Sequence, residues 1–206
     1  MKKFTFVLIA FFAVAIGLYP FAYVLADMSM GLLATKPADL LQDKVWRVAF
    51  HVHIFLGGVS LLAGWSQFSR VLRNRNLGLH RLLGKVYLVS VLLSGVAGLY
   101  IAFYASAGVI AATGFGFLAI GWLFTSAMAY RHIRNRNIDA HQHWMIRSYA
   151  LTFAAVTLRI WLPLMDFAMG MDFFDAYRIV AWLCWVPNAL IAEIIIRKVQ
   201  REPVTV

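Results

Sequence analysis

Six apolar stretches, each long enough to cross a membrane, are the dominant feature of this sequence. A helix rises about 1.5 Å per residue and the hydrocarbon core of a bilayer is about 30 Å thick, so about 20 apolar residues cross it. A membrane barrel is not expected, because the period-2 alternation of its strands is absent. The pattern predicts an all-α polytopic transmembrane helical bundle of one domain, residues 1–206, with spans near 4–26, 46–68, 82–104, 109–130, 144–165 and 177–196.

Composition and motifs exclude several classes of protein. Hydrophobic residues make up 62% of the chain and charged residues 14%, and a soluble domain of this size could not bury so much apolar surface. The single cysteine, Cys184, allows neither an intrachain disulfide nor a dithiol redox reaction. The chain has no P-loop, no HExxH zinc motif and no Gly-x-Ser-x-Gly motif, so a hydrolytic enzyme is not expected.

The first apolar stretch has two interpretations. Lys2 and Lys3 precede it and the small-residue ending Val24–Ala26 follows, as in a secretory signal peptide. Its apolar run, however, is longer than the roughly 7–15 residues of a signal-peptide core. The length favours a retained anchor helix over a cleaved leader.

Basic residues concentrate on one side of the predicted bundle. With the N-terminus inside, 14 of the 19 Lys and Arg residues are cytoplasmic, and six of the nine acidic residues lie outside. This bias predicts that both termini are cytoplasmic. Together with contact between the cytoplasmic face and anionic lipid, it accounts for the net charge of +10, so nucleic acid is not an expected partner. The sequence identifies no protein partner.

One motif occurs twice. Arg73–Asn76 followed by His80 recurs as Arg134–Asn137 followed by His141, and a Gly-Trp pair precedes each copy. The repeat suggests that spans 2–3 and 4–5 are duplicated hairpins, related by an axis along the membrane normal, that form a four-helix core. The alternative is that two hairpin loops independently use Arg and Asn to meet lipid head groups.

Three spans carry stripes of small and polar residues at helical spacing. The stripes are His53, Gly57, Ser60, Gly64 and Gln67; His80, Gly84, Tyr87, Ser94 and Gly98; and His141, Met145, Ser148, Thr152, Ala155 and Arg159. Such faces turn away from lipid, so they predict a polar interior that could hold a cofactor, a substrate or a proton path. Tight helix packing through Gly and Ser is the alternative.

Two histidines could bind a cofactor near the cytoplasmic end. His80 and His141 lie at the same predicted depth, where two imidazoles can ligate the iron of haem b or help to bind a quinone. Only a haem would make them metal ligands. Tyr87, Trp144 and Arg147 are the further candidate contacts of this site. The alternative is that these histidines are interfacial residues that touch phosphates.

A second candidate site lies near the outer end. Arg159 is inside a span, where a guanidinium needs a partner or a wet cavity. His53 lies at a similar depth on span 2, and Asp166 is close to Arg159 in sequence, at the outer end of span 5. Arg159 could instead extend to the interface with no further role. Glu193 is expected to pair with Arg197, four residues along the same helix, and with Lys198.

The segments His80–Tyr87, His141–Ala150 and Ala154–Arg159 resemble a family of bacterial multi-pass membrane proteins, domain of unknown function 2306, over roughly residues 45 to 165. The resemblance implies a bacterial inner (cytoplasmic) membrane and supplies no reaction. It favours His80, His141, Trp144, Arg147 and Arg159 over His132 and His143 as functional residues. Two functions are left open: a membrane redox protein that binds b-type haem or quinone, and a small-solute transporter or membrane accessory protein without enzymatic activity.

Overall fold

The chain folds into a bundle of membrane-spanning helices. A computed structural model describes residues 3–21 and 31–201, and this part of the chain contains no strand. Six helical segments within it are long and apolar enough to cross a membrane: Phe4–Phe21, Lys44–Phe68, Leu77–Ala102, Val109–Arg134, Ile138–Ala168 and Phe173–Gln200. The predicted all-α fold with six spans is confirmed. Lys2 and the predicted end of the first span, 22–26, lie outside the described residues.

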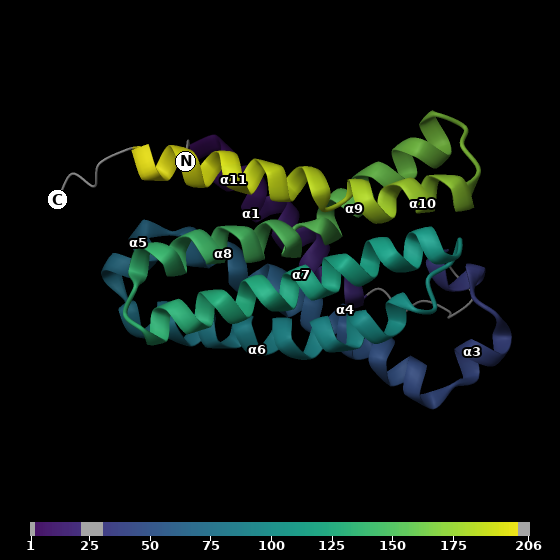
Figure 1. The fold of residues 1–206 in the computed structure, drawn as a ribbon, viewed down its shortest axis with the longest axis horizontal. Coiled ribbons are helices and arrows are strands. Elements are labelled where there is room, and N and C mark those ends of the chain that lie inside the picture. The colour runs from purple at the N-terminus through teal and green to yellow at the C-terminus, as the bar shows by residue number, and fades with distance from the viewer. Residues whose placement is uncertain (1–2, 22–30, 202–206) are drawn as a thin grey trace.

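Ten α-helices make up these segments and their connections in the described residues (Figure 1). They are α1 (Lys3–Leu18), α3 (Ala38–Gln42), α4 (Lys44–Gly64), α5 (Arg70–Arg75), α6 (Leu77–Ala102), α7 (Val109–Arg134), α8 (Ile138–Thr152), α9 (Ala154–Pro163), α10 (Phe173–Leu183) and α11 (Val186–Arg201). Short turns of tighter helix cover Tyr19–Phe21, Gly31–Thr35 and Trp65–Phe68, and a π-helical turn covers Leu164–Ala168.

Spans 2 to 5 form the centre of the bundle. Helix α4 packs against α6, α6 against α7, and α7 against α8, while α1 lies on α4, α10 on α7 and α11 on α8. Figure 1 shows α5 and the turn between α7 and α8 at one end of the bundle, with α3 and the turn between α6 and α7 at the other. We call the first the basic end, because it carries the two Arg-rich hairpins 70–81 and 131–141, and the second the opposite end.

The repeated motif has the same local structure in both hairpins. The side chain of Asn76 accepts a hydrogen bond of 2.9 Å from Leu79 N, and that of Asn137 accepts one of 3.0 Å from Ala140 N. Each asparagine therefore caps the helix that follows it. These caps explain why α6 and α8 begin at Leu77 and Ile138, before the predicted boundaries at 82 and 144.

The Gly-Trp pairs, in contrast, are not equivalent. Trp65 opens a short turn at the end of α4, whereas Trp122 lies in the middle of α7. The shared caps agree with a duplication of the two hairpins. The different positions of the two tryptophans in their spans give the duplication no further support. The duplicated four-helix core stays a prediction.

The last two spans are broken in the middle of the membrane. Span 5 breaks at Phe153 between α8 and α9, and span 6 breaks at Cys184 between α10 and α11. Pro187 has no N–H to donate to the preceding turn of span 6. At the break itself, Cys184 O accepts hydrogen bonds from Thr157 Oγ1 and from Asn188 Nδ2, the second at 2.9 Å. Interrupted spans are tolerated where other groups satisfy the freed backbone in this way.

Candidate functional site

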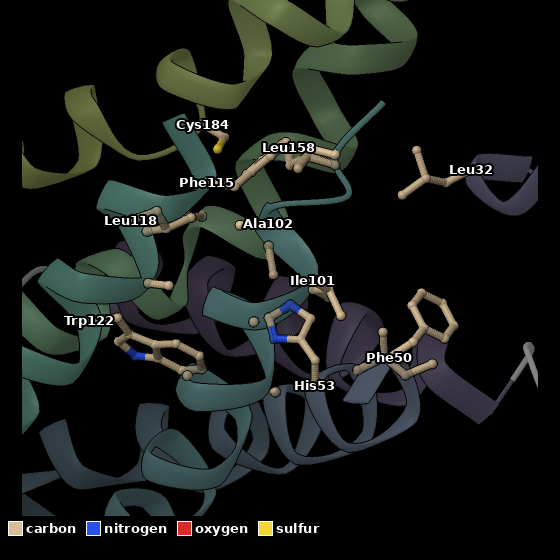
Figure 2. Close-up of a pocket in the computed structure, with 18 of the residues that line it drawn as sticks. Leu32, Phe50, His53, Ile101, Ala102, Phe115, Leu118, Trp122, Leu158 and Cys184 are labelled. Carbon is tan, nitrogen blue, oxygen red and sulfur yellow. The ribbon is translucent and has the colours of Figure 1, made fainter. Parts of the chain in front are cut away.

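A cavity of about 240 Å³ lies inside the bundle, in the half away from the basic end. Residues of all six spans line it, and most of them are apolar (Figure 2). Its polar or ionisable lining side chains are few: Lys36, Trp46, His53, Trp122, Thr152, Arg159, Tyr177 and Cys184. An apolar cavity with a few polar groups is the usual form of a small-molecule site.

His53 is held in one orientation by the neighbouring span. Its Nδ1 lies 2.9 Å from Ser94 O, and the Ser94 hydroxyl donates to His53 O at 2.8 Å. The ring can approach α6 because Gly98 has no side chain: a Cβ there would lie 2.7 Å from Nδ1. A carbonyl oxygen only accepts, so Nδ1 carries the proton and Nε2 of the neutral ring presents a lone pair.

The Nε2 atom is therefore available to a ligand. Figure 2 shows the ring of His53 among the cavity-lining residues, in the same cavity as Trp122, Leu158 and Cys184. No residue of the described chain makes a hydrogen bond to Nε2. A neutral imidazole nitrogen in an apolar cavity can accept a hydrogen bond from a hydroxyl or receive its proton.

Arg159 lines the same cavity and interacts electrostatically with His53. Its Nη1 donates to Ala155 O at 2.9 Å, and the guanidinium lies over the Tyr19 ring at 4.7 Å. The structure thus brings together two members of the second predicted site. It does not bring in the third, because Asp166 lies in the π-helical turn after α9 and does not line the cavity.

The floor of the cavity continues into a buried hydrogen-bond network. Thr152 Oγ1 accepts from Trp122 Nε1 at 2.8 Å and donates to Ser148 O at 3.0 Å. Its remaining lone pair can accept only from the Tyr87 hydroxyl, 2.8 Å away. Tyr87 then accepts from the Ser148 hydroxyl at 2.6 Å, and Ser148 accepts from Ser126 at 2.7 Å.

This network joins three spans and leaves Tyr87 fully engaged. Tyr87 lies on α6, Trp122 and Ser126 on α7, and Ser148 and Thr152 on α8. Tyr87 is completely buried and does not line the cavity. Its observed contacts are those of a residue that holds helices together.

His80 and His141 both lie at the basic end and interact electrostatically with each other. Nδ1 of His141 lies 2.8 Å from Ala129 O, which leaves its Nε2 available. Nδ1 of His80 is buried and has no hydrogen-bond partner among the described residues. Neither histidine lines the cavity, so a haem between them stays a prediction.

Arg147 connects α8 to α11, and Trp144 packs against the ring of Phe124 on α7. Arg147 forms a bidentate ion pair with Glu193 through contacts of 2.6 and 2.9 Å, and its guanidinium lies 4.6 Å from the centre of the Trp144 ring. Glu193 thus hydrogen-bonds to another span instead of to Arg197, the partner predicted from spacing.

Sequence reasoning did not select Lys36, Trp46, Trp122 or Cys184 as site residues. Lys36 lies in the connection between spans 1 and 2, where charge marks the end of a span, and the others lie in apolar runs. Helical periodicity shows which residues share a face of one span. It contains no signal for which faces of different spans meet around one cavity.

Comparison with known proteins agrees with the architecture. No curated protein and no solved structure matches the chain. A family profile described as predicted membrane protein (DUF2306) matches residues 50–196, from within α4 to within α11. The matched region contains His53, Arg159 and most of the cavity lining. The chain therefore belongs to the DUF2306 family of predicted membrane proteins.

Proposed function

We propose that this membrane protein binds the head group of a quinone or quinol in the cavity, with His53 and Arg159 as its polar contacts. The observation that carries the proposal is the free Nε2 of His53, whose ring is held by Ser94 in an apolar cavity that Arg159 also lines. A quinol hydroxyl would donate to Nε2, and a quinone oxygen would accept from the guanidinium.

The dimensions and walls of the cavity fit such a ring. An apolar cavity of about 150 Å³ holds benzene, and this one, at about 240 Å³, has room for a substituted six-membered ring. Trp122 offers an indole and Leu158 an aliphatic surface to its faces. The mainly apolar walls favour this occupant over the hydrated solute of a transporter.

A quinone is also favoured over a haem at this place. Ligation of a haem iron on both sides needs two histidines, and His53 is the one histidine in the cavity lining. The bis-histidine pair, His80 and His141, would form a separate site at the basic end.

We infer further that the basic end faces the cytoplasm of a bacterial inner membrane. Four arginines are exposed there and would meet anionic head groups: Arg73 and Arg75 on α5, Arg134 at the end of α7, and Arg136 in the turn before α8. This orientation places the cavity in the outer half of the bilayer.

The test is binding of a decyl-substituted 1,4-benzoquinol, kept reduced, to the purified protein in nanodiscs, because its hydroxyl can donate to Nε2 of His53. We expect His53→Ala to weaken binding about tenfold, because the hydrogen bond and its cavity contact are lost. His51→Ala is the matched control: His51 lies on the same helix, does not line the cavity, and has Nδ1 2.7 Å from Arg47 O. Equal binding by wild type and His53→Ala would contradict the proposal.

A further inference from the structure

Leu32, Leu33 and Lys36, in the segment 31–36, line the end of the cavity farthest from the basic end. Leu33 in this segment is fully buried against Trp46 and Phe50. Thr35 Oγ1 lies 2.8 Å from Ser106 Oγ, so the segment is attached to the connection between α6 and α7. We call residues 31–36 the strap. Trp46, which packs against Leu33, and Lys36, whose backbone N–H donates to Leu33 O, both line the cavity, and each carries a side-chain hydrogen-bond donor.

Trp46 has a donor without an acceptor. Its side chain is only 2% exposed, and its Nε1 is buried with no hydrogen-bond partner among the described residues. A buried donor left unpaired typically costs about 1–3 kcal/mol. Most buried indole N–H groups have a partner. A donor of this kind in a cavity wall indicates an acceptor that the protein itself does not supply.

Lys36 is the second donor. Its ammonium donates to Tyr104 O, the one hydrogen bond that it makes within the described chain, although an ammonium has three donors. Among the described residues, no aspartate or glutamate lines the cavity. Burial lowers the pKa of Lys36 from 10.5 to about 8, because a charged ammonium loses part of its hydration there. At neutral pH it is still mostly charged and can donate to an oxygen.

We propose that Trp46 Nε1 and the Lys36 ammonium form a second polar subsite, which binds a ligand oxygen on the opposite edge of the ring from the oxygen at His53. Trp46 and His53 are seven residues apart on α4, on one face and about 10 Å apart along the axis. Side chains that converge from these two positions can contact opposite edges of one ligand ring. This subsite rests on the proposed function and deepens it: the ligand is a 1,4-dioxygenated ring, with its second oxygen beneath the strap.

The test compares two probes that differ by one oxygen, the quinol 2-decyl-1,4-benzenediol, kept reduced, and 2-decylphenol, in nanodiscs. Trp46→Phe removes the N–H and keeps a ring to stack on Phe50. We expect it to weaken quinol binding about fivefold and to leave phenol binding unchanged, because the phenol has only the oxygen bound at His53. Lys36→Met should act in the same direction, and Lys44→Met, which removes a lysine outside this cavity, should have no effect.

Each outcome is decisive. Equal losses for both probes in Trp46→Phe, or an unchanged affinity for the quinol in both Trp46→Phe and Lys36→Met, would overturn the subsite. Lys36→Met changes a connection outside the spans, so it remains informative if Trp46→Phe does not fold. Selective loss in these variants with normal quinol binding by His53→Ala would remove His53 from the site and retain the subsite. Absence of quinol binding by the wild type would overturn both proposals.

Discussion

His53 and Tyr87 each place a hydrogen-bonding group inside the bundle: a ring nitrogen in His53 and a hydroxyl in Tyr87. The neighbours of these groups give the two residues different roles. The ring of His53 has one nitrogen bonded to a backbone carbonyl and the other available in a cavity. The hydroxyl of Tyr87 has both a donor and an acceptor partner, Ser148 and Thr152, in a network without free positions. At the scale of a residue, unsatisfied hydrogen-bonding capacity therefore separates a candidate ligand-binding group from a structural one.

The role of Tyr87 predicts a loss of stability when its hydroxyl is removed. In Tyr87→Phe the Ser148 hydroxyl loses its acceptor and Thr152 loses a donor, so we expect the free energy of unfolding to fall by about 1–3 kcal/mol. Thermal unfolding of the purified protein in detergent measures this as a lower midpoint. Tyr130→Phe is the control, because Tyr130 is 51% exposed on α7. Equal midpoints for the two variants would show that the network contributes no stability.

At the scale of an element, the ends and breaks of the helices are determined by a few polar contacts. Asn76 and Asn137 start α6 and α8, and Thr157 and Asn188 satisfy the carbonyl at the break of span 6. The C-terminal part of span 6, α11, is connected to α8 by the ion pair of Arg147 and Glu193. The side chains of this pair are 26% and 45% exposed, so solvent screens their attraction in part.

This pair predicts a rescue by charge exchange. Arg147→Glu and Glu193→Arg should each lower the free energy of unfolding by about 1 kcal/mol, and the double variant should regain most of the loss. Chemical unfolding followed by circular dichroism provides the four values of the cycle. A double variant that is as unstable as the sum of both changes would mean that the contact does not bind α11 to α8.

At the scale of the whole molecule, the basic residues of distant connections come together at one end. Helix α5 and the turn between α7 and α8 share this end, and α11 runs to it (Figure 1). The acidic residues Asp39 and Asp172 lie in segments at the opposite end. The asymmetry supports the orientation proposed from the positive-inside rule.

Labelling of single cysteines in a Cys184→Ser background tests this orientation. A membrane-impermeant thiol reagent should label Asp39→Cys and Asp172→Cys in intact cells. It should label Asn74→Cys and Asn135→Cys only after the cells are permeabilised. The reverse pattern would place the Arg-rich hairpins outside and the cavity in the inner half of the bilayer.

The sequence by itself determined the six spans, the all-α class and the separation of charge between the two ends. Each of these depends on local properties, because hydropathy and charge decide, segment by segment, whether the chain lies in the bilayer or in water. The presence of Arg159 and His53 inside spans also predicted an outer site, because an ionisable group in lipid is costly wherever its span packs.

Only the tertiary structure decided which side chains meet. It placed His53 and Arg159 in one cavity without Asp166, added Trp46 and Lys36 to the lining, and gave Glu193 a partner on another span. It also fixed the tautomer of His53 through a carbonyl 41 residues away in the chain. These facts depend on the rotation and separation of packed helices, and periodicity within one helix carries no information about either.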